Sequence, residues 1–391
     1  MKFDLIIVYC CESMQIPICD WREKRERQKE INKIRNRLHS IEYDVVQFLK
    51  PCLRDVKAKS TVMKTWPLLA NQRCGAWYTG SLTKSSCYFK SVDGHVGTWN
   101  FSLKRLNLEV FRSARKAGGC WIVDASRSKE MPDSFSRTIP IWAAVLNRII
   151  LKYRQAHKTR GWDRSLYTPN TISHEERDAI IALLDARVEE LFTSGVILQP
   201  NELAQLNKPL RPVWITEDTV NNCDEMQHLD ELANNYCLIV CVSCGFRSHL
   251  PKDISFTYSS GAGDDDESWS RGLTPDIFCK KKSAILKLST NDQVEALVDQ
   301  LVIAAKDEDT GDDCSFHAIG ESGIFIGTRR AGKPPECWEC FDAILNVTTL
   351  EYEEMVSESP LPESHYYLQL PVEEGTRPVS GCRVGGGGAV F

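Results

Sequence analysis

The sequence predicts a mixed α/β protein, and three observations support that prediction. Amphipathic segments with helical spacing alternate along the chain with short apolar segments typical of buried strands. Apolar residues make up 42% and charged residues 26% of the 391 residues, an ordinary globular balance. Runs of apolar residues stay shorter than the roughly 20 that a membrane-spanning helix needs, so we expect a soluble protein without a membrane partner.

A long basic helix is the first predicted element. Residues 20–49 repeat apolar side chains at helical spacing, and the rest of their surface is rich in Lys and Arg. Pro51 is expected to end this helix, since proline lacks the amide hydrogen that would continue it. Residues 66–101 then change to short aromatic segments separated by turn residues, which predicts short strands and loops.

A buried strand and two helices are predicted next. Residues 118–124 form an apolar run after a glycine turn, and Pro140 is expected to open an apolar helix. Ser173 and Glu176 have the spacing of a capping box, in which the serine hydroxyl accepts from the Glu176 amide and the glutamate reaches back. The helix that follows is expected to end at Gly195.

The second half of the chain is predicted to continue the alternation. A stiff linker leads into a strand, and further strands follow around an acidic loop and one more helix. The linker covers 208–212, the helix covers 291–305, and the strands cover 213–215, 236–242, 323–327, 343–348 and 366–370.

Charge is divided unevenly along the chain. Residues 1–170 contain 31 Lys and Arg against 15 Asp and Glu, whereas residues 171–391 contain 17 against 38. Lys and Arg bind nucleic acids by releasing condensed counterions from the phosphates. The basic half therefore predicts a polyanionic partner, although solvated helix faces are the alternative reading of the same charges.

A carboxylate ends the predicted strand at Asp124, and small, hydroxyl and cationic residues follow it. Ligands of open α/β sheets bind outside the carboxyl ends of the strands. Asp124 is expected to accept hydrogen bonds from sugar hydroxyls, while Ser126, Arg127 and Lys129 hold a phosphate. An aspartate that caps a turn beside surface cations would give the same pattern.

An acidic loop after residue 260 is a candidate Mg²⁺ site. Consecutive carboxylates repel one another unless solvent or a cation relieves the repulsion. Mg²⁺ commonly binds one or two carboxylates together with the phosphates of a substrate. Asp264 and Asp265 are therefore the candidate ligands, and an exposed acidic loop is the alternative.

Asp93 and His95 are candidates for proton transfer. A base that removes a proton from a ribose 2′-hydroxyl must lie within hydrogen-bond reach of that hydroxyl, and either side chain is suited to this. A histidine in a turn that is merely exposed is the alternative interpretation.

Two cysteine patterns suggest other classes of protein. Cys241 and Arg247 have the Cys-x5-Arg spacing of cysteine phosphatases, although one glycine and no preceding histidine accompany them. The Cys-x-x-Cys pairs at 241/244 and 337/340 suggest a zinc site, although a long separation divides the two pairs. Buried free thiols are the interpretation we favour for all of these cysteines.

Several ordered segments together resemble the initiator tRNA phosphoribosyltransferase family of fungi and plants. Their order matches the family over most of residues 25–350. The set carries the resemblance, and it includes NQRCGAWY (71–78), YFKSVDGH (88–95), GGCWIVD (118–124), PDSFSRTIPIW (132–142) and GAGDDDESW (261–269).

The resemblance implies a reaction and its partners. The family transfers 5-phosphoribose from phosphoribosyl diphosphate to the 2′-hydroxyl of adenosine 64 in initiator tRNA, which keeps that tRNA out of elongation. A cytoplasmic pentosyltransferase that uses Mg²⁺ is therefore expected. The residues expected to contact the RNA backbone are Arg35, Arg37, Lys90, Arg105 and Arg211.

The resemblance also predicts two domains. Residues 20–335 would form the family-specific N-terminal domain, and residues 336–391 would begin a domain similar to dual-specificity phosphatases that stays incomplete. No Cys-x5-Arg phosphate loop follows Cys382, because position 388 is glycine. A catalytically defective tRNA-binding protein is therefore the alternative to an active transferase.

Overall fold

The computed structural model describes most of the chain and divides it into two compact units, Met1–Val302 and Ile303–Phe391. Each unit is described by itself. The predicted phosphatase-like character of 336–391 stays a prediction. The residues described are 18–60, 62–72, 74–83, 85–127, 129–154, 161–194, 200–217, 223–245, 253–309, 316–319, 322–352 and 365–371.

A five-stranded parallel sheet in the order β2-β1-β3-β5-β4 organises the first unit. The predicted α/β class is therefore confirmed. Because every pair is parallel, the carboxyl ends of all these strands meet at one edge of the sheet. The strands are β1 (Leu68–Asn71), β2 (Ser86–Cys87), β3 (Gly119–Ala125), β4 (Leu210–Ile215) and β5 (Cys237–Cys244).

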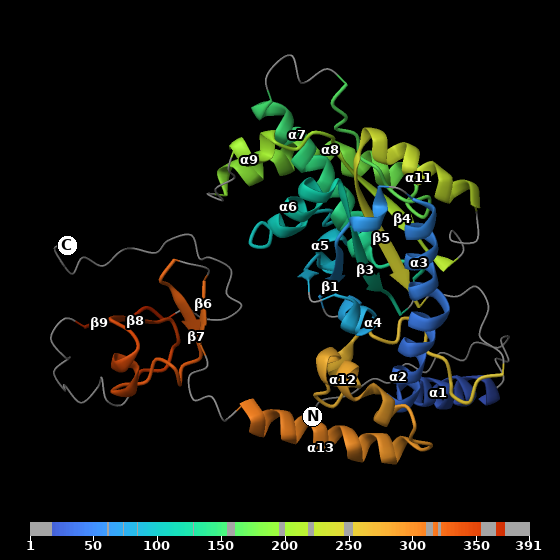
Figure 1. Cartoon of the computed structure of the whole chain (residues 1–391), viewed down its shortest axis with the longest axis vertical. Coiled ribbons are helices and arrows are strands. Elements are labelled where there is room, and N and C mark those ends of the chain that lie inside the picture. The colour runs from blue at the N-terminus through green and yellow to red at the C-terminus, as the bar shows by residue number, and fades with distance from the viewer. Residues whose placement is uncertain are drawn as a thin grey trace, which may run out of the picture. The chain divides into compact units, whose positions relative to one another are not determined.

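Helices cover both faces of this sheet (Figure 1). Along β3, Trp121 and Val123 pack into one core while Cys120 and Ile122 pack into the other, so every residue of the strand is buried. The first core is covered by α2 (Ile34–Asp44), a π-turn (Val45–Leu49), α3 (Lys50–Lys59), α4 (Gly75–Thr79), α11 (Cys223–Asn235), α12 (Pro275–Ile285) and α13 (Asn291–Asp309). The second is covered by α6 (Leu108–Ala117), a π-turn (Ser134–Thr138), α7 (Ile139–Tyr153), α8 (His174–Thr193) and α9 (Pro200–Ala204).

The long N-terminal helix differs from its prediction. It is interrupted at Lys33, which separates α1 (Ile18–Asn32) from α2, and it continues past Pro51 to Lys59. The prediction that Pro51 ends the helix is wrong, because this proline lies in the first turn of α3, where its missing amide hydrogen costs little.

A second difference concerns residues 75–79, which form the short helix α4 and not a strand. The helix lies so close to the sheet that a Cβ on Gly75 would lie 2.0 Å from the Val123 carbonyl oxygen. Glycine therefore permits this contact, which places the turn after β1 against β3.

The predicted start of α8 is confirmed in part. The Ser173 hydroxyl accepts a hydrogen bond from the Glu176 amide at 3.2 Å. The Glu176 side chain does not reach back, because its carboxylate accepts from Arg137 and Trp99 instead. The predicted helix end at Gly195 lies outside the described residues.

The second unit contains two small sheets. Strands β6 (Phe316–Ala318) and β7 (Phe325–Gly327) are antiparallel, whereas β8 (Ala343–Asn346) and β9 (Tyr366–Gln369) are parallel. The predicted strands at 323–327, 343–348 and 366–370 correspond to β7, β8 and β9. Across the described part of the whole chain, no helix combines the length and apolarity needed to cross a bilayer.

Candidate functional site at the carboxyl edge of the sheet

A cavity of about 420 Å³ opens at the carboxyl ends of β1 and β3. Strand β2 lies on one side of β1 and strand β3 on the other side of β1, so the direction in which strands are added to the sheet reverses between β1 and β3. Ligands of open α/β sheets bind at such reversal points. Asn71 and Asp124, the residues near the ends of these strands, both line the cavity.

Asp124 forms the floor of the cavity. Its side chain is 4% exposed and accepts hydrogen bonds from the Asn71 amide at 2.6 Å, the Ser134 hydroxyl at 2.9 Å and the Ala125 backbone amide at 2.9 Å. Burial raises the pKa of this carboxyl to about 7, although these hydrogen bonds oppose the shift. The group is therefore held rigidly and changes its charge near neutral pH.

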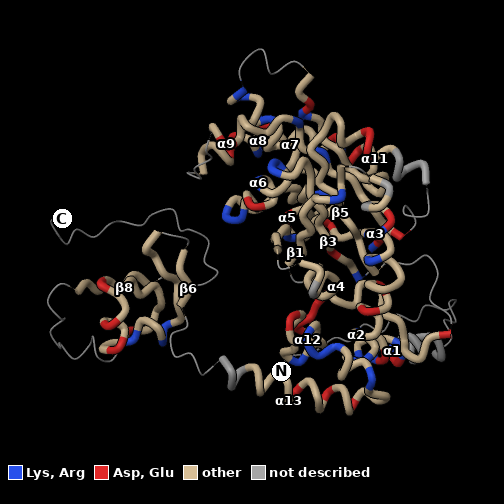
Figure 2. Tube along the Cα trace, in the orientation of Figure 1, with Lys and Arg blue, Asp and Glu red and all other residues tan. Residues whose placement is uncertain are grey.

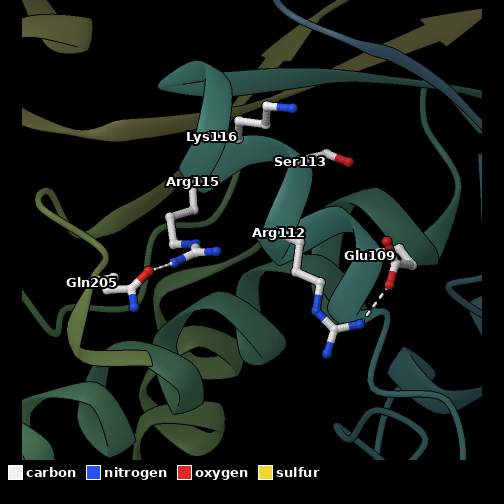
Figure 3. Close-up of a pocket in the computed structure, with 6 residues that line it drawn as sticks. All are labelled: Glu109, Arg112, Ser113, Arg115, Lys116 and Gln205. Carbon is white, nitrogen blue, oxygen red and sulfur yellow. Dashed lines mark hydrogen bonds and ion pairs between the residues drawn. The ribbon is translucent and has the colours of Figure 1, made fainter. Parts of the chain in front are cut away.

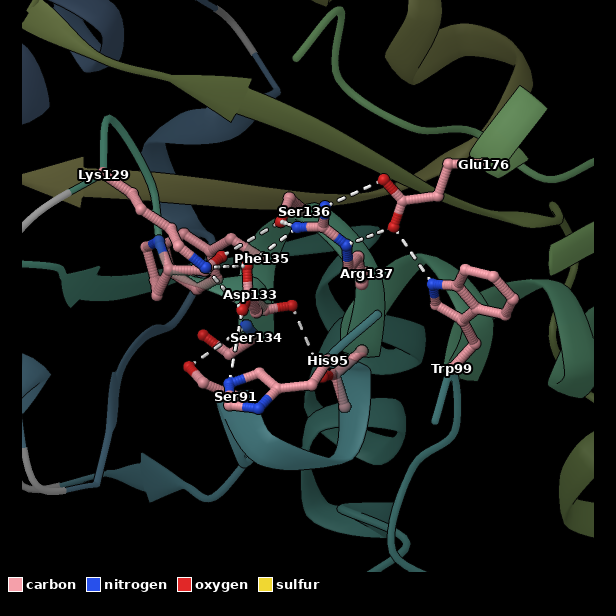
Figure 4. A network of polar contacts seen from close by, with 12 residues as sticks. Ser91, His95, Trp99, Lys129, Asp133, Ser134, Phe135, Ser136, Arg137 and Glu176 are labelled. Carbon is pink, nitrogen blue, oxygen red and sulfur yellow. Dashed lines mark hydrogen bonds and ion pairs between the residues drawn. The ribbon is translucent and has the colours of Figure 1, made fainter. Parts of the chain in front are cut away.

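Asp133 gathers three nitrogen-containing side chains beside the cavity (Figure 4). Lys129 Nζ lies 2.7 Å and Arg137 2.8 Å from its carboxylate, and His95 Nε2 lies 3.4 Å from Oδ2. The buried Asp133 therefore fixes the positions of two predicted site residues, His95 and Lys129, at the mouth of the cavity.

Arg137 connects this wall to α8. Its guanidinium makes a paired contact with Glu176, with Nε–Oε1 at 2.6 Å and a second bond to Oε2 at 2.9 Å. The Arg137 hydrogen bond holds the pKa of Glu176 below its usual range. Trp99 donates to the same carboxylate at 3.0 Å, so the loop that contains His95 is anchored to α8 as well.

The acidic loop forms another wall of the cavity. Gly261 has a φ of +54°, and a Cβ at this position would lie 2.2 Å from the Ser126 carbonyl. Glycine therefore lets the loop after β5 rest directly on the loop after β3. The Arg127 amide lies 3.4 Å from Asp264 Oδ2, and both Asp264 and Asp265 line the cavity.

Arg37 supports the acidic loop from beneath. Its guanidinium is fully buried and donates to the Ala262 carbonyl at 3.1 Å and to the Asn32 side chain at 2.9 Å. Burial lowers the pKa of Arg37 to about 10, and the charge of Arg127 adds to this shift. The predicted contact of Arg37 with RNA is therefore corrected, because the side chain has no exposed surface to offer.

The residues of the acidic loop are compatible with Mg²⁺ but do not form a metal cage. Among the described residues, no group of three His, Cys, Asp or Glu side chains is arranged to hold a metal ion. Asp264 and Asp265 offer two carboxylates at the cavity wall, which fits an ion whose remaining ligands are water and substrate phosphates. Mg²⁺ therefore stays a prediction.

The structure brings seven of the predicted site residues to one cavity and leaves the others elsewhere. Arg127 adjoins the acidic loop but points its side chain to Asn32. Asp93 is not among the lining residues, and burial raises the pKa of its half-buried carboxyl. The residues that line the cavity are Lys90, His95, Asp124, Ser126, Lys129, Asp264 and Asp265.

The predicted RNA contacts are similarly divided. Arg105 lies over the Tyr88 ring at 4.4 Å and borders a second hollow that shares Tyr88 with the cavity. Arg35 bonds the Leu288 carbonyl away from the cavity. Arg211 lies opposite Leu238 near the amino end of the sheet, between the rings of two tyrosines, so the structure does not bring it to the cavity.

Sequence reasoning missed three residues of the cavity, Asn71, Tyr88 and Asp133, and also Ser134, which bonds Asp124. Asn71 gave a usable signal, because it ends a short apolar strand in the same way as Asp124. Asp133 gave no such signal. Its partners Lys129 and Arg137 are each four residues away, but the sequence does not mark this segment as helical.

The two alternative cysteine sites do not fit the geometry. Cys241 lies in the middle of β5 in one core and Cys244 lies in the other, so the two thiols point to opposite faces of the sheet. They cannot share a zinc ion. Burial raises the pKa of Cys241 well above its usual range, which disfavours a nucleophilic thiolate. Arg247 lies outside the described residues.

Comparisons with known proteins agree with the sequence resemblance. The family model described as the Rit1 N-terminal domain matches residues 27–303. The uncharacterized protein C3F10.06c of Schizosaccharomyces pombe is 32% identical over 302 residues, which are 76% of this chain and 65% of that protein. The tRNA A64-2′-O-ribosylphosphate transferase of Saccharomyces cerevisiae is 36% identical over 272 residues, which are 65% of this chain and 51% of that protein.

The matched region is thus only part of each relative. The chain spans 65% of the length of the first of these curated relatives and 51% of the second. No solved structure has a significant match to the chain.

Proposed function

The chain belongs to the Rit1 family, and from that premise we propose that it transfers 5-phosphoribose from phosphoribosyl diphosphate to a tRNA. The acceptor in this proposal is the 2′-hydroxyl of adenosine 64 of initiator tRNA. The Saccharomyces cerevisiae relative is named for a transfer of ribosylphosphate to the 2′-oxygen of A64 of a tRNA, which supports the choice of nucleotide. We place the reaction in the cytoplasm, where initiator tRNA is used.

One observation supports this proposal above the others: a single cavity contains both carboxylates that can bind a metal ion and a histidine that can act as a base. Carboxylates of the acidic loop line one wall, and Lys129 and His95, both held by Asp133, line another. A diphosphate leaving group needs its charge neutralised, and a hydroxyl nucleophile needs a base. With Mg²⁺ held by the carboxylates, one wall would meet the first need, and His95 on the other wall would meet the second.

The donor fits the floor and the acidic wall. Asp124 would accept hydrogen bonds from the ribose hydroxyls, while Ser126 and Lys129 would hold the 5-phosphate. Mg²⁺, when bound by Asp264, Asp265 and the diphosphate, would supply neutralisation of the leaving group. Arg127, whose backbone amide faces Asp264, would keep this wall in place.

The acceptor fits the cationic wall. His95 would take the proton from the 2′-hydroxyl, because its Nε2 faces Asp133 and leaves Nδ1 able to accept. The acceptor oxygen then forms a bond to C1 of the donor ribose as the bond from C1 to the diphosphate oxygen breaks. The diphosphate leaves with the electron pair, and Lys90 and Arg105 at the rim would contact the RNA backbone.

A labelled donor tests the proposal. Phosphoribosyl diphosphate labelled in its 5-phosphate is incubated with Mg²⁺, the full chain and unmodified initiator tRNA. We expect label in the tRNA and none in a tRNA that carries 2′-deoxyadenosine at position 64, which lacks the acceptor hydroxyl. Replacing Asp264 and Asp265 with Asn is expected to raise the Mg²⁺ concentration needed for half-maximal transfer.

The same experiment separates the second candidate, a tRNA-binding protein without catalysis. That candidate takes the cationic residues at the rim of the cavity, Lys90 and Arg105, as an RNA-binding surface alone. Tight binding of initiator tRNA without transfer of label would support it and would overturn the transferase proposal. Equal transfer to an elongator tRNA would overturn the proposed initiator specificity alone.

A further inference from the structure

A second polar groove lies along α6, away from the cavity. Its volume is about 520 Å³, and it runs between the outer face of α6 and the residues that follow α9 (Figure 3). The lining residues are Glu109, Arg112, Ser113, Arg115, Lys116 and Gln205. None of them was assigned a role by sequence or family.

The cationic side chains of this groove differ in whether a carboxylate pairs with them. Arg112 bonds Glu202 at 2.7 Å and Glu109 at 2.5 Å, so its charge is matched and it ties α6 to α9. Arg115 bonds the neutral Gln205, as Figure 3 shows. The buried Nε of Arg115 has no hydrogen-bond partner among the described residues.

Lys116 adds a second charge without a carboxylate partner. Its side chain is exposed, and no ion pair to it occurs in the described part of the chain. The Arg115 and Lys116 end of the groove is therefore positive, whereas the Glu109 end is balanced by Arg112. Arg115 and Lys116 point in different directions from the last turn of α6 (Figure 3), so each cation suits a separate phosphate of an extended polyanion.

The position of the groove relates it to the cavity. Arg105, which borders the hollow next to the cavity, lies three residues before the start of α6. The helix contains 10 residues and therefore extends roughly 15 Å from this point. Lys and Arg therefore occur both before α6 and in its last turn, with Glu109 in the first turn between them (Figure 2).

We propose that the Arg115 and Lys116 end of this groove binds backbone phosphates of the tRNA at a distance from the modified nucleotide. The inference rests on the proposed function, since it takes tRNA as the partner. It assigns to the α6 groove the affinity for the rest of the tRNA body, and to the cavity the chemistry. Phosphates carry most of the sequence-independent affinity of proteins for nucleic acids.

A charge-removal variant tests the proposal. Arg115→Gln and Lys116→Gln are combined, and binding of initiator tRNA is measured between 50 and 200 mM KCl. The slope of log K against log salt should fall by about 1 to 2, because roughly 0.9 counterions are released per phosphate contacted. The KM for tRNA should rise about tenfold, while kcat at saturating tRNA stays unchanged.

A matched control removes the same charge elsewhere. Lys281 and Lys287 are exposed residues on and after α12, which packs on the other face of the sheet. Replacing both with Gln should leave the salt slope unchanged. A hairpin that contains only the T arm should bind the Arg115/Lys116 variant and the unmodified chain equally, because it does not reach the groove.

Two outcomes would overturn the inference. An unchanged salt slope in the Arg115/Lys116 variant would show that no phosphate binds there. If the Arg115/Lys116 variant melts at a lower temperature but binds RNA with unchanged affinity, both cations stabilise the C-terminal turn of α6 and do not bind phosphate. Failure of the proposed transfer is distinguishable, since the unmodified chain would then transfer no label, whereas the salt slope tests the groove by tRNA binding alone.

Discussion

Replacing Asp124 with Asn is expected to stabilise the fold above neutral pH while it slows transfer. The carboxyl has an ordinary pKa of 3.8 and a folded pKa of about 7, because burial disfavours its charged form. A raised folded pKa means that stability is fully present below pH 3.8 and is lost as the pH rises through about 7. Ionisation therefore costs the folded state roughly 4 kcal/mol once the pH is well above 7, at about 1.4 kcal/mol per unit.

The asparagine removes this pH-dependent cost but mispairs one hydrogen bond. Its amide group would face either the Ala125 amide or the donors from Asn71 and Ser134, a loss of about 1 to 3 kcal/mol that does not depend on pH. Between pH 5 and pH 8.5 the free energy of unfolding of the variant should rise by about 2 to 3 kcal/mol relative to the unmodified chain.

Urea unfolding at both pH values measures this difference. Asp276→Asn, a change at an exposed carboxylate on α12, serves as the control and should show little change over the same range. Transfer by the Asp124 variant should fall about 10- to 100-fold, the effect of losing a hydrogen bond to a charged group. A stability difference that is the same at pH 5 and pH 8.5 would refute the assignment of a raised pKa to Asp124.

Three further changes test the walls of the cavity. His95→Gln should lower kcat for transfer about 100-fold or more with an unchanged melting temperature, and a loss below threefold would exclude His95 as the base. Gly261→Ala should destabilise the fold and weaken donor binding together, measured by thermal unfolding and by KM, because its methyl group would overlap the Ser126 carbonyl. Arg37→Lys should lower the free energy of unfolding by about 1 to 3 kcal/mol without changing the salt dependence of tRNA binding; a changed salt slope would return Arg37 to the RNA surface.

The sequence could predict those parts of the site that depend on the order of neighbouring residues in the chain. Asp124 ends an apolar run and is followed by hydroxyl and cationic residues, so its place at the edge of the sheet followed from the sequence. The acidic loop was also marked by its composition. Their meeting in one cavity was expected only from the family resemblance, because contact between residues 126 and 261 is a tertiary property.

Other features could not be predicted because tertiary contacts override local preference. Arg37 lies in a basic helix whose charges suggest an exposed face, yet its guanidinium is buried and donates to the Ala262 carbonyl, far along the chain. Glu176 has capping-box spacing but binds Arg137 instead, because a paired guanidinium is a stronger partner than a single backbone amide. Pro51 would end an isolated helix, but the π-turn before it lets a new helical segment begin.

The order of strands has a consequence for how the chain reaches its folded state. Gly119 of β3 pairs with Leu238 of β5, although the two are far apart in the sequence. During synthesis β3 emerges long before the neighbour that covers its inner edge. Parallel pairings between distant segments form slowly, and unpaired apolar edges favour aggregation in the meantime. Assistance by a chaperone during synthesis would therefore benefit this unit more than a protein whose neighbouring strands follow one another directly.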